Sequence, residues 1–134
     1  MKKVAKLLLI DPDQRYLLLS RSGHPRFGDD PDLPGGTVEA GEATRDAVVR
    51  EVMEETGITV NADNTTELYA GTDYSQHATH YSLFVAAITT IPKVTISWEH
   101  SGYEWLSRDD LLRRARAAED TYMQMVADVV TRMK

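Results

Sequence analysis

Three glutamates lie close together near the middle of this chain. Glu51, Glu54 and Glu55 fall in a stretch without glycine or proline, which is typical of a helix. Residues three and four apart share one face of a helix, so these carboxylates repel one another unless a positive charge lies between them. A hard divalent cation, which prefers oxygen ligands, meets that need. Gly35 and Gly36 lie just upstream, where bare backbone can approach a metal ion or a phosphate closely. The pattern predicts a magnesium site.

The helix that carries these glutamates is predicted over Glu42–Thr56, and Gly57 is expected to end it in the C′ position. At the helical repeat of about 100° per residue, one arc of this helix is apolar and another is acidic. The apolar arc holds Val48, Val49, Val52 and Met53. The helix is therefore expected to bury one side and to present its glutamates on a different side.

The chain before this helix predicts two strands and a loop. Apolar runs flank the turn sequence Asp-Pro-Asp, so strands are expected over Val4–Ile10 and Arg15–Ser20. A loop rich in glycine, proline and aspartate follows over Ser22–Pro34. Long ordered loops in compact domains are often functional.

The chain after this helix predicts further strands and then two helices. The strands are expected over Glu67–Tyr74, His80–Ile88, Val94–Trp98 and Tyr103–Leu106. The helices are expected from the N-cap Ser107 through Ala117 and over Thr121–Met133. This order predicts one α/β domain over residues 1–134, with a mixed sheet between helices on both faces, an α/β/α sandwich.

Composition narrows the class of protein. The chain has 134 residues, a net charge of −6 and no cysteine. The charge argues against a nucleic-acid partner, which normally needs a basic face, but a metal ion can supply positive charge for a nucleotide substrate. The N-terminal apolar run is short, contains Lys6 and stops at Asp11, so a strand is expected rather than a signal peptide. No run is long enough to span a membrane, and a cytoplasmic protein is expected.

The stretch Gly36–Ile58 resembles the signature of the Nudix hydrolases, the Nudix box. That signature is a Gly, five residues, a Glu, seven residues, and then Arg-Glu-apolar-any-Glu-Glu-any-Gly-apolar. The matching positions here are Gly36, Glu42, Arg50, Glu51, Val52, Glu54, Glu55, Gly57 and Ile58. So many fixed positions at set spacing make a specific signal. The order of the predicted elements also resembles that of a Nudix domain.

The resemblance implies roles for these residues. The three glutamates correspond to the carboxylates that bind magnesium, and Gly35 corresponds to a residue whose backbone carbonyl often completes the coordination. Arg50 corresponds to an arginine that pairs with the box glutamates and orients them, with support from Glu42. Glu54 is the first candidate for the catalytic base that takes a proton from water.

The resemblance also implies a reaction, the hydrolysis of a nucleoside diphosphate linked to another group. Mg²⁺ is the expected cofactor and Mn²⁺ the second candidate. A MutT-like cleavage of a nucleoside triphosphate to a monophosphate and pyrophosphate is expected, with dinucleoside polyphosphate hydrolysis as the alternative. A nucleotide-sensing module without turnover is the alternative from another class, although such a protein would be expected to lack a box carboxylate. An acidic calcium-buffering face is a third hypothesis, with no EF-hand loop to support it.

Glu99 is the strongest candidate outside the box. It lies in Trp98-Glu99-His100, shortly before Tyr103-Glu104-Trp105. This resembles an arrangement in many Nudix enzymes that cleave nucleoside triphosphates, where the glutamate contributes to metal binding or base catalysis. Glu99 is therefore a candidate metal ligand and the second candidate for the base.

Two residues are candidates for substrate binding. Arg21 ends the second predicted strand, where family members often carry a basic residue near the phosphates; an exposed strand-end arginine is the alternative. Tyr74 lies in a region where a tyrosine is loosely associated with dinucleoside polyphosphate substrates. The four histidines, His24, His77, His80 and His100, show no metal-ligand spacing and are expected at the surface or in hydrogen bonds.

One position departs from the family pattern. Many relatives carry an aromatic residue, often Trp, three positions before the proline that precedes the box, and this chain has Pro31 there. The neighbouring acidic residues, which include Asp32, are expected either to repel phosphates or to join the outer shell of the metal. Dimers are common in the family, so a homodimer stays open, although no segment identifies an interface.

Overall fold

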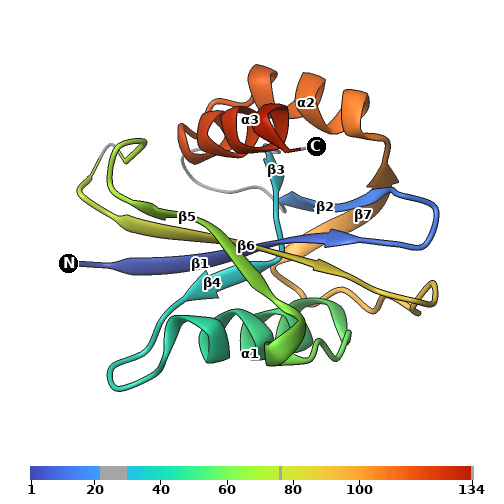
Figure 1. Cartoon of the computed structure of the whole chain (residues 1–134), viewed down its shortest axis with the longest axis horizontal. Helices are drawn as coiled ribbons and strands as arrows, with labels where there is room; N and C mark the ends of the chain where they lie inside the picture. Colours follow the sequence, from blue (N-terminus) through green and yellow to red (C-terminus); the bar gives the residue numbers. More distant parts are fainter. Residues whose placement is uncertain (22–29, 76, 134) are drawn as a thin grey trace.

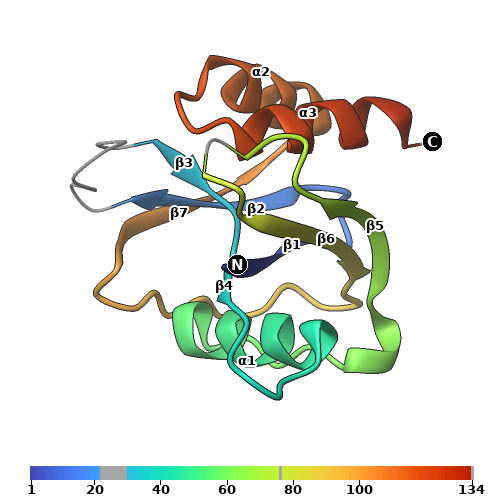
Figure 2. The ribbon, with the colours of Figure 1, turned by 90° about the vertical axis from the view of Figure 1, so that its left-hand side faces the viewer.

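The computed structural model describes residues 1–21, 30–75 and 77–133 (Figure 1). A seven-stranded sheet lies at the centre of the described part of the chain, and helices cover both of its faces (Figure 2). The strands are β1 (Lys3–Ile10), β2 (Tyr16–Arg21), β3 (Pro31–Asp32), β4 (Gly35–Thr37), β5 (Thr66–Gly71), β6 (His80–Ala87) and β7 (His100–Leu106). The helices are α1 (Thr44–Thr56), α2 (Arg108–Ala117) and α3 (Tyr122–Arg132), with a short 3-10 turn at Ala62–Asn64.

The sheet is mixed, as predicted. β1 pairs in parallel with β6 over its whole length, and the remaining pairings are antiparallel. α1 covers one face, and α2 and α3 cover the other (Figures 1 and 2). The predicted α/β/α sandwich is therefore confirmed. None of the described helices is long and apolar enough to cross a membrane.

β1 and β2 separate after their turn, and this separation makes room for the site. The two strands pair at Ile10 and Tyr16. Further along, β4 takes the place beside β1, with Lys6 opposite Gly35, while β3 pairs with β2. The chain from β3 to β4 thus passes from the side of α2 and α3 to the side of α1 (Figure 1). Loop residues just before the Nudix box are carried between the two layers.

Two hydrophobic cores hold the layers together. Alternate side chains of a strand point to opposite faces, so an uninterrupted apolar strand can serve both cores. Leu8 and Leu18 pack under α2 and α3, whereas their neighbours in the strands pack over α1. Those neighbours are Leu7, Leu9, Leu17 and Leu19. Each fully buried leucine stabilises the fold by roughly 1.5–3 kcal/mol.

Two predicted helix ends are confirmed. Gly57 adopts a left-handed conformation (φ 74°), and its N–H donates to the Met53 carbonyl over 2.9 Å. Ser107 caps α2, since its hydroxyl accepts from the Asp110 N–H at 3.2 Å.

The predicted division of α1 into an apolar and an acidic side is wrong for two residues. Met53 is 42% exposed, whereas Glu55 is 3% exposed. Glu55 is buried because it turns toward β4, where a backbone N–H binds its carboxylate. The helix therefore delivers one carboxylate into the protein interior.

The strand predicted over Val94–Trp98 is also wrong, although its residues alternate in polarity. This segment is irregular and follows the C-terminal end of α1. The N–H groups of Thr95 and Ser97 donate to the carbonyls of Thr56 and Glu55, over 2.8 and 3.0 Å. The last carbonyls of a helix lack hydrogen-bond donors within the helix, and the N–H groups of this segment act as those donors.

The remaining differences concern short elements and boundaries. The strand predicted to reach Tyr74 ends at Gly71. β4 was not predicted, and part of the predicted loop Ser22–Pro34 forms β3. The loop's residues 22–29 lie outside the described residues.

Candidate active site

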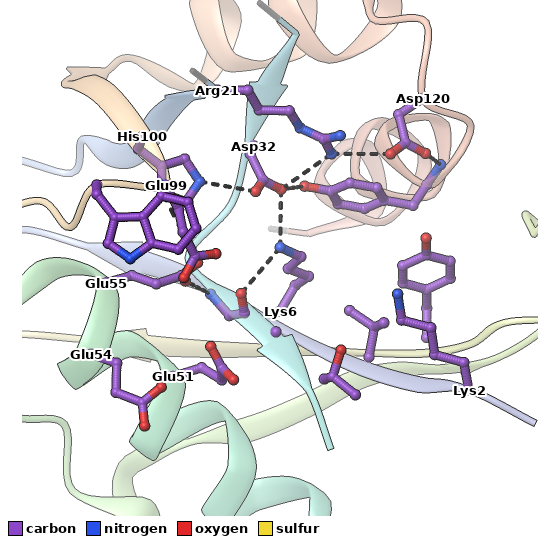
Figure 3. Close-up of a pocket in the computed structure, with 17 residues that line it drawn as sticks. Lys2, Lys6, Arg21, Asp32, Glu51, Glu54, Glu55, Glu99, His100 and Asp120 are labelled. Atoms are coloured by element: carbon purple, nitrogen blue, oxygen red, sulfur yellow. Dashed lines mark hydrogen bonds and ion pairs between the residues drawn. The ribbon is translucent and has the colours of Figure 1, made fainter. Parts of the chain in front are cut away.

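A pocket of about 540 Å³ opens where β1 and β2 separate (Figure 3). Its volume is in the range of small-molecule sites. The pocket gathers six of the predicted site residues: Arg21, Gly35, Glu51, Glu54, Glu55 and Glu99. Four of these are acidic, and three come from α1.

Glu55 is the most buried of the pocket's glutamates. Its Oε1 accepts from the Gly35 N–H at 2.7 Å. Burial raises the pKa of Glu55 to about 7, against the lowering effect of the Lys6 ammonium. A carboxyl with such a pKa is one that a bound cation would readily deprotonate.

Gly35 and Gly36 bring backbone against these carboxylates. A side chain at Gly36 would begin 2.5 Å from the Glu51 carboxyl carbon. At Gly35, where φ is +134°, a Cβ would lie 2.1 Å from the Ala5 carbonyl oxygen. Glycine is therefore required at Gly35, where backbone is in the way, whereas a side chain at Gly36 would displace the Glu51 carboxylate from its present position.

Arg50 connects the carboxylates of three glutamates. Its guanidinium donates to Glu42 over 2.9 and 3.0 Å, to Glu51 over 2.9 Å and to Glu54 over 3.2 Å. The guanidinium also donates to the Thr37 carbonyl over 3.1 Å. A planar guanidinium can hold several carboxylates in fixed relative positions, which is the arrangement that the resemblance implies for this arginine.

Glu54 and Glu99 are the accessible acids of the pocket. Both are exposed, and both lie close enough to Glu51 for their charges to raise its pKa, although burial is the larger cause. Glu99 reaches the pocket from the irregular segment before β7. The two candidates for the catalytic base therefore face the same space.

The donor set fits a hard divalent cation. Carboxylate and carbonyl oxygens are the ligands that Mg²⁺ and Mn²⁺ prefer. The Gly35 carbonyl accepts from Lys6 Nζ at 3.2 Å, and a carbonyl oxygen has two lone pairs, so the same atom can also bind a metal. Within the residues that the structure describes, no three His, Cys, Asp or Glu side chains already stand in a geometry that could hold a metal ion. The carboxylates would have to close around one.

A buried charge network centred on Asp32 forms the floor of the pocket (Figure 3). Lys6 Nζ lies 3.0 Å from Asp32 Oδ1, and His100 Nε2 lies 3.1 Å from Oδ2. The Tyr122 hydroxyl also donates to Asp32. Burial alone would raise the pKa of Asp32, but Lys6 and its other partners hold it well below its usual range. Lys6, Arg21 and His100 all face the Asp32 carboxylate, so much of its negative charge is compensated inside the protein. Its expected effect on phosphates or on the outer shell of a metal stays a prediction.

Arg21 belongs to the same network. It is 8% exposed, donates to Asp120 Oδ2 over 3.0 Å and lies 3.5 Å from Asp32 Oδ1. The alternative of an exposed strand-end arginine is wrong. Arg21 lines the pocket with a guanidinium already held by two carboxylates.

The structure places Tyr74 away from the pocket. Its hydroxyl donates to Asp128 Oδ2 at 2.6 Å, and its carbonyl accepts from the Thr121 hydroxyl at 2.5 Å. Tyr74 thus fastens the chain after β5 to α3, and it is not among the described residues that line the pocket. Its predicted part in substrate binding has no support in this geometry.

Several pocket residues were missed by sequence reasoning. They include Lys2, Lys6, Tyr81, Trp98, His100, Asp120 and Tyr122. Lys6 carried a signal, since a lysine interrupts an otherwise apolar strand. Tyr122 and Asp120 carried none, because their partners lie 90 and 99 residues away. His100 was expected in a hydrogen bond or at the surface; the bond is present and the ring is buried.

Comparison with known proteins agrees with this fold. A family model described as the NUDIX domain matches residues 2–126. The chain therefore belongs to the Nudix family, and the predicted family is confirmed. Among solved structures, the MutT protein from Methanosarcina mazei Go1 is 27% identical with a TM-score of 0.71, over 98% of this chain and 91% of that one.

Two curated relatives are similar over part of their length. A Bacillus subtilis (strain 168) protein with the provisional name 8-oxo-dGTP diphosphatase is 32% identical over 103 residues, which are 77% of this chain and 64% of the relative. An ADP-ribose pyrophosphatase of Methanocaldococcus jannaschii is 40% identical over 65 residues, which are 48% of this chain and 38% of the relative. The matches thus span less than two thirds of these relatives.

Proposed function

We propose that this protein is a pyrophosphohydrolase that depends on Mg²⁺ or Mn²⁺ and cleaves a nucleoside triphosphate to a monophosphate and pyrophosphate. The observation that carries the proposal is the gathering of four glutamates and the Gly35 backbone in one pocket. Membership of the Nudix family and the names of the curated relatives support a phosphoanhydride substrate.

Glu51, Glu54 and Glu55 would hold the cation, with the Gly35 carbonyl and Glu99 as further ligands. Bound Mg²⁺ would neutralise the phosphate oxygens and lower the pKa of a water molecule. A phosphoanhydride brings negative charge of its own, so four carboxylates suit it only in the presence of a cation.

The chain's own residues would position water and move its proton. Glu54 is the proposed base because its side chain is 57% exposed and can reach solvent. It accepts a proton as the water oxygen bonds to phosphorus and the bridging P–O bond breaks. Arg50 keeps Glu54 and Glu51 in place through its bonds of 3.2 and 2.9 Å.

A hydrolysis panel tests the proposal. It compares ordinary nucleoside triphosphates, 8-oxo-dGTP, ADP-ribose and a dinucleoside polyphosphate, each with and without Mg²⁺, and identifies the products. Glu54→Gln is expected to lower kcat by about 10²–10⁴, the contribution of a positioned base. Glu67→Gln is the matched control, because Glu67 is an exposed glutamate on β5.

Two results would overturn the proposal. One is the absence of product from every compound in folded protein that binds Mg²⁺, which would favour a nucleotide-sensing module. The other is a preference for the dinucleoside polyphosphate, which would favour the alternative reaction.

A further inference from the structure

Trp98 is a tryptophan that the fold leaves in solvent. Its side chain is 87% exposed. Trp105, the other tryptophan of the chain, is partly buried against the core between the sheet and α1. A tryptophan ring carries one of the largest apolar surfaces of any side chain. Folding gains little from Trp98, so its exposed ring is available to a ligand.

The position of Trp98 connects it with the site. Five large apolar side chains are exposed in the described part of the chain: Met1, Met53, Ile91, Trp98 and Tyr103. Of these five, Trp98 alone lines the pocket. It does so beside Glu99 and in the same cavity as the glutamates of α1.

The backbone on both sides of Trp98 is held by the site itself. On one side, the Ser97 N–H donates to the Glu55 carbonyl over 3.0 Å. On the other side, the His100 N–H donates to the Ser97 carbonyl over 3.3 Å, and the His100 ring is bonded to Asp32. The turn that carries Trp98 is therefore fixed to α1 and to the pocket floor. A ring on a fixed turn needs little ordering when a ligand binds.

We propose that Trp98 is the stacking platform for the nucleobase of the substrate. This inference rests on the proposed function, because phosphates held over the glutamates would place the rest of the nucleotide near the rim of the same pocket. Every base has a flat π face, so an aromatic platform recognises bases as a class rather than one base. Trp98 would thus separate nucleotides from base-free polyphosphates.

Binding measurements test the inference without relying on turnover. In Trp105→Phe protein, Trp98 is the remaining tryptophan, so its fluorescence reports on the rim of the pocket alone. The probes are a nucleoside triphosphate with an uncleavable α,β-methylene bridge and inorganic triphosphate, both with Mg²⁺. We expect the nucleotide to quench Trp98 and inorganic triphosphate to leave its emission nearly unchanged.

Variants of Trp98 supply the affinities, measured by calorimetry. Stacking of one base corresponds to a change of roughly fivefold to hundredfold in Kd. Trp98→Ala should weaken nucleotide binding by that factor and change triphosphate binding by less than about twofold, while Trp98→Phe should restore most of the loss. Exposure of the ring predicts an unchanged thermal unfolding midpoint for both variants.

The possible outcomes separate the two proposals. Nucleotide quenching in a protein that hydrolyses nothing would support Trp98 stacking and overturn the proposed function. Normal hydrolysis with equal nucleotide binding by the parent and Trp98→Ala would overturn stacking and leave the proposed function standing. Equal weakening of nucleotide and triphosphate binding in Trp98→Ala would also overturn stacking, because the ring would then act on the phosphates or the metal.

Discussion

Replacing Asp32 by asparagine removes a buried negative charge that faces two buried cations. Lys6 lies 3.0 Å from the Asp32 carboxylate and Arg21 lies 3.5 Å from it. Removing one partner of a buried ion pair costs about 3–5 kcal/mol, because the other charge stays buried without compensation. Arg21 keeps Asp120 at 3.0 Å, so the lower end of that range, about 3 kcal/mol, is expected. For a domain of this size the unfolding midpoint should fall by roughly 10 °C.

Urea unfolding followed by circular dichroism measures this cost and its source. Lys6→Met removes the facing ammonium, so the double variant should be less destabilised than the sum of the two single variants. The expected coupling is about 1 kcal/mol or more. Asp63→Asn is the control, since Asp63 is an exposed aspartate in the 3-10 turn and should stay within about 0.5 kcal/mol.

The difference in unfolding free energy between the parent and Asp32→Asn should also depend on pH, which gives a second test. Although burial opposes it, the partners of Asp32 hold its folded pKa well below the unfolded value. Its contribution is therefore complete above the unfolded pKa of about 4 and is lost as pH falls through the folded pKa. Three results would refute this account of the pocket floor. Asp32→Asn could lower the free energy of unfolding by less than about 1 kcal/mol, or its effect could add fully to that of Lys6→Met. The third result is a stability difference between the parent and Asp32→Asn that grows on acidification.

Three further predictions follow from the geometry around the glutamates. Gly35→Ala should lower the free energy of unfolding, measured by chemical denaturation, by more than about 3 kcal/mol, because the new Cβ would overlap a backbone oxygen of β1. Gly41 has φ +78° and open space around it, so Gly41→Ala is the control and should lower that free energy by about 1 kcal/mol. Equal losses in the two variants would contradict this. Burial raises the pKa of Glu55 to about 7, so the unfolded chain loses this proton at a lower pH than the folded protein does. The free energy of unfolding of metal-free protein should therefore fall by up to about 3 kcal/mol as pH rises from about 4.5 through 7. In Glu55→Gln this dependence on pH should disappear. Arg50→Lys should weaken Mg²⁺ binding or activity by about 10–100-fold in a metal titration. Arg45 lies on the same helix but bonds to Thr65, outside the pocket, so Arg45→Lys is the control and should match the parent.

Local signals explain why most of the fold could be predicted. The apolar runs of β1 and β2, the cap at Ser107 and the glycine at the end of α1 each act within a few residues. The short strands β3 and β4 could not be read in this way, because two or three residues rich in glycine and proline show no period. Their place is decided by the gap between β1 and β2.

The irregular segment before β7 shows the limit of periodicity. Its alternation of apolar and polar residues fits a strand, but hydrogen bonds to the end of α1 hold it in another conformation. This tertiary contact carries Trp98 and Glu99 into the pocket.

The two halves of the site differed in how far they could be predicted. The acidic half lies in one motif on one helix, so spacing alone brings Glu51, Glu54 and Glu55 together. The buried half joins Asp32 to Tyr122 across 90 residues, and no local pattern contains that pairing.

Phosphorus NMR of the reaction tests the central claim most directly. A nucleoside triphosphate is incubated with the parent or with Glu54→Gln, in Mg²⁺ and in excess chelator. The account predicts equal amounts of nucleoside monophosphate and pyrophosphate from the parent with Mg²⁺, and almost none with chelator or with the variant. Equal rates for parent and variant, or release of inorganic phosphate from the end of the chain in place of pyrophosphate, would contradict it.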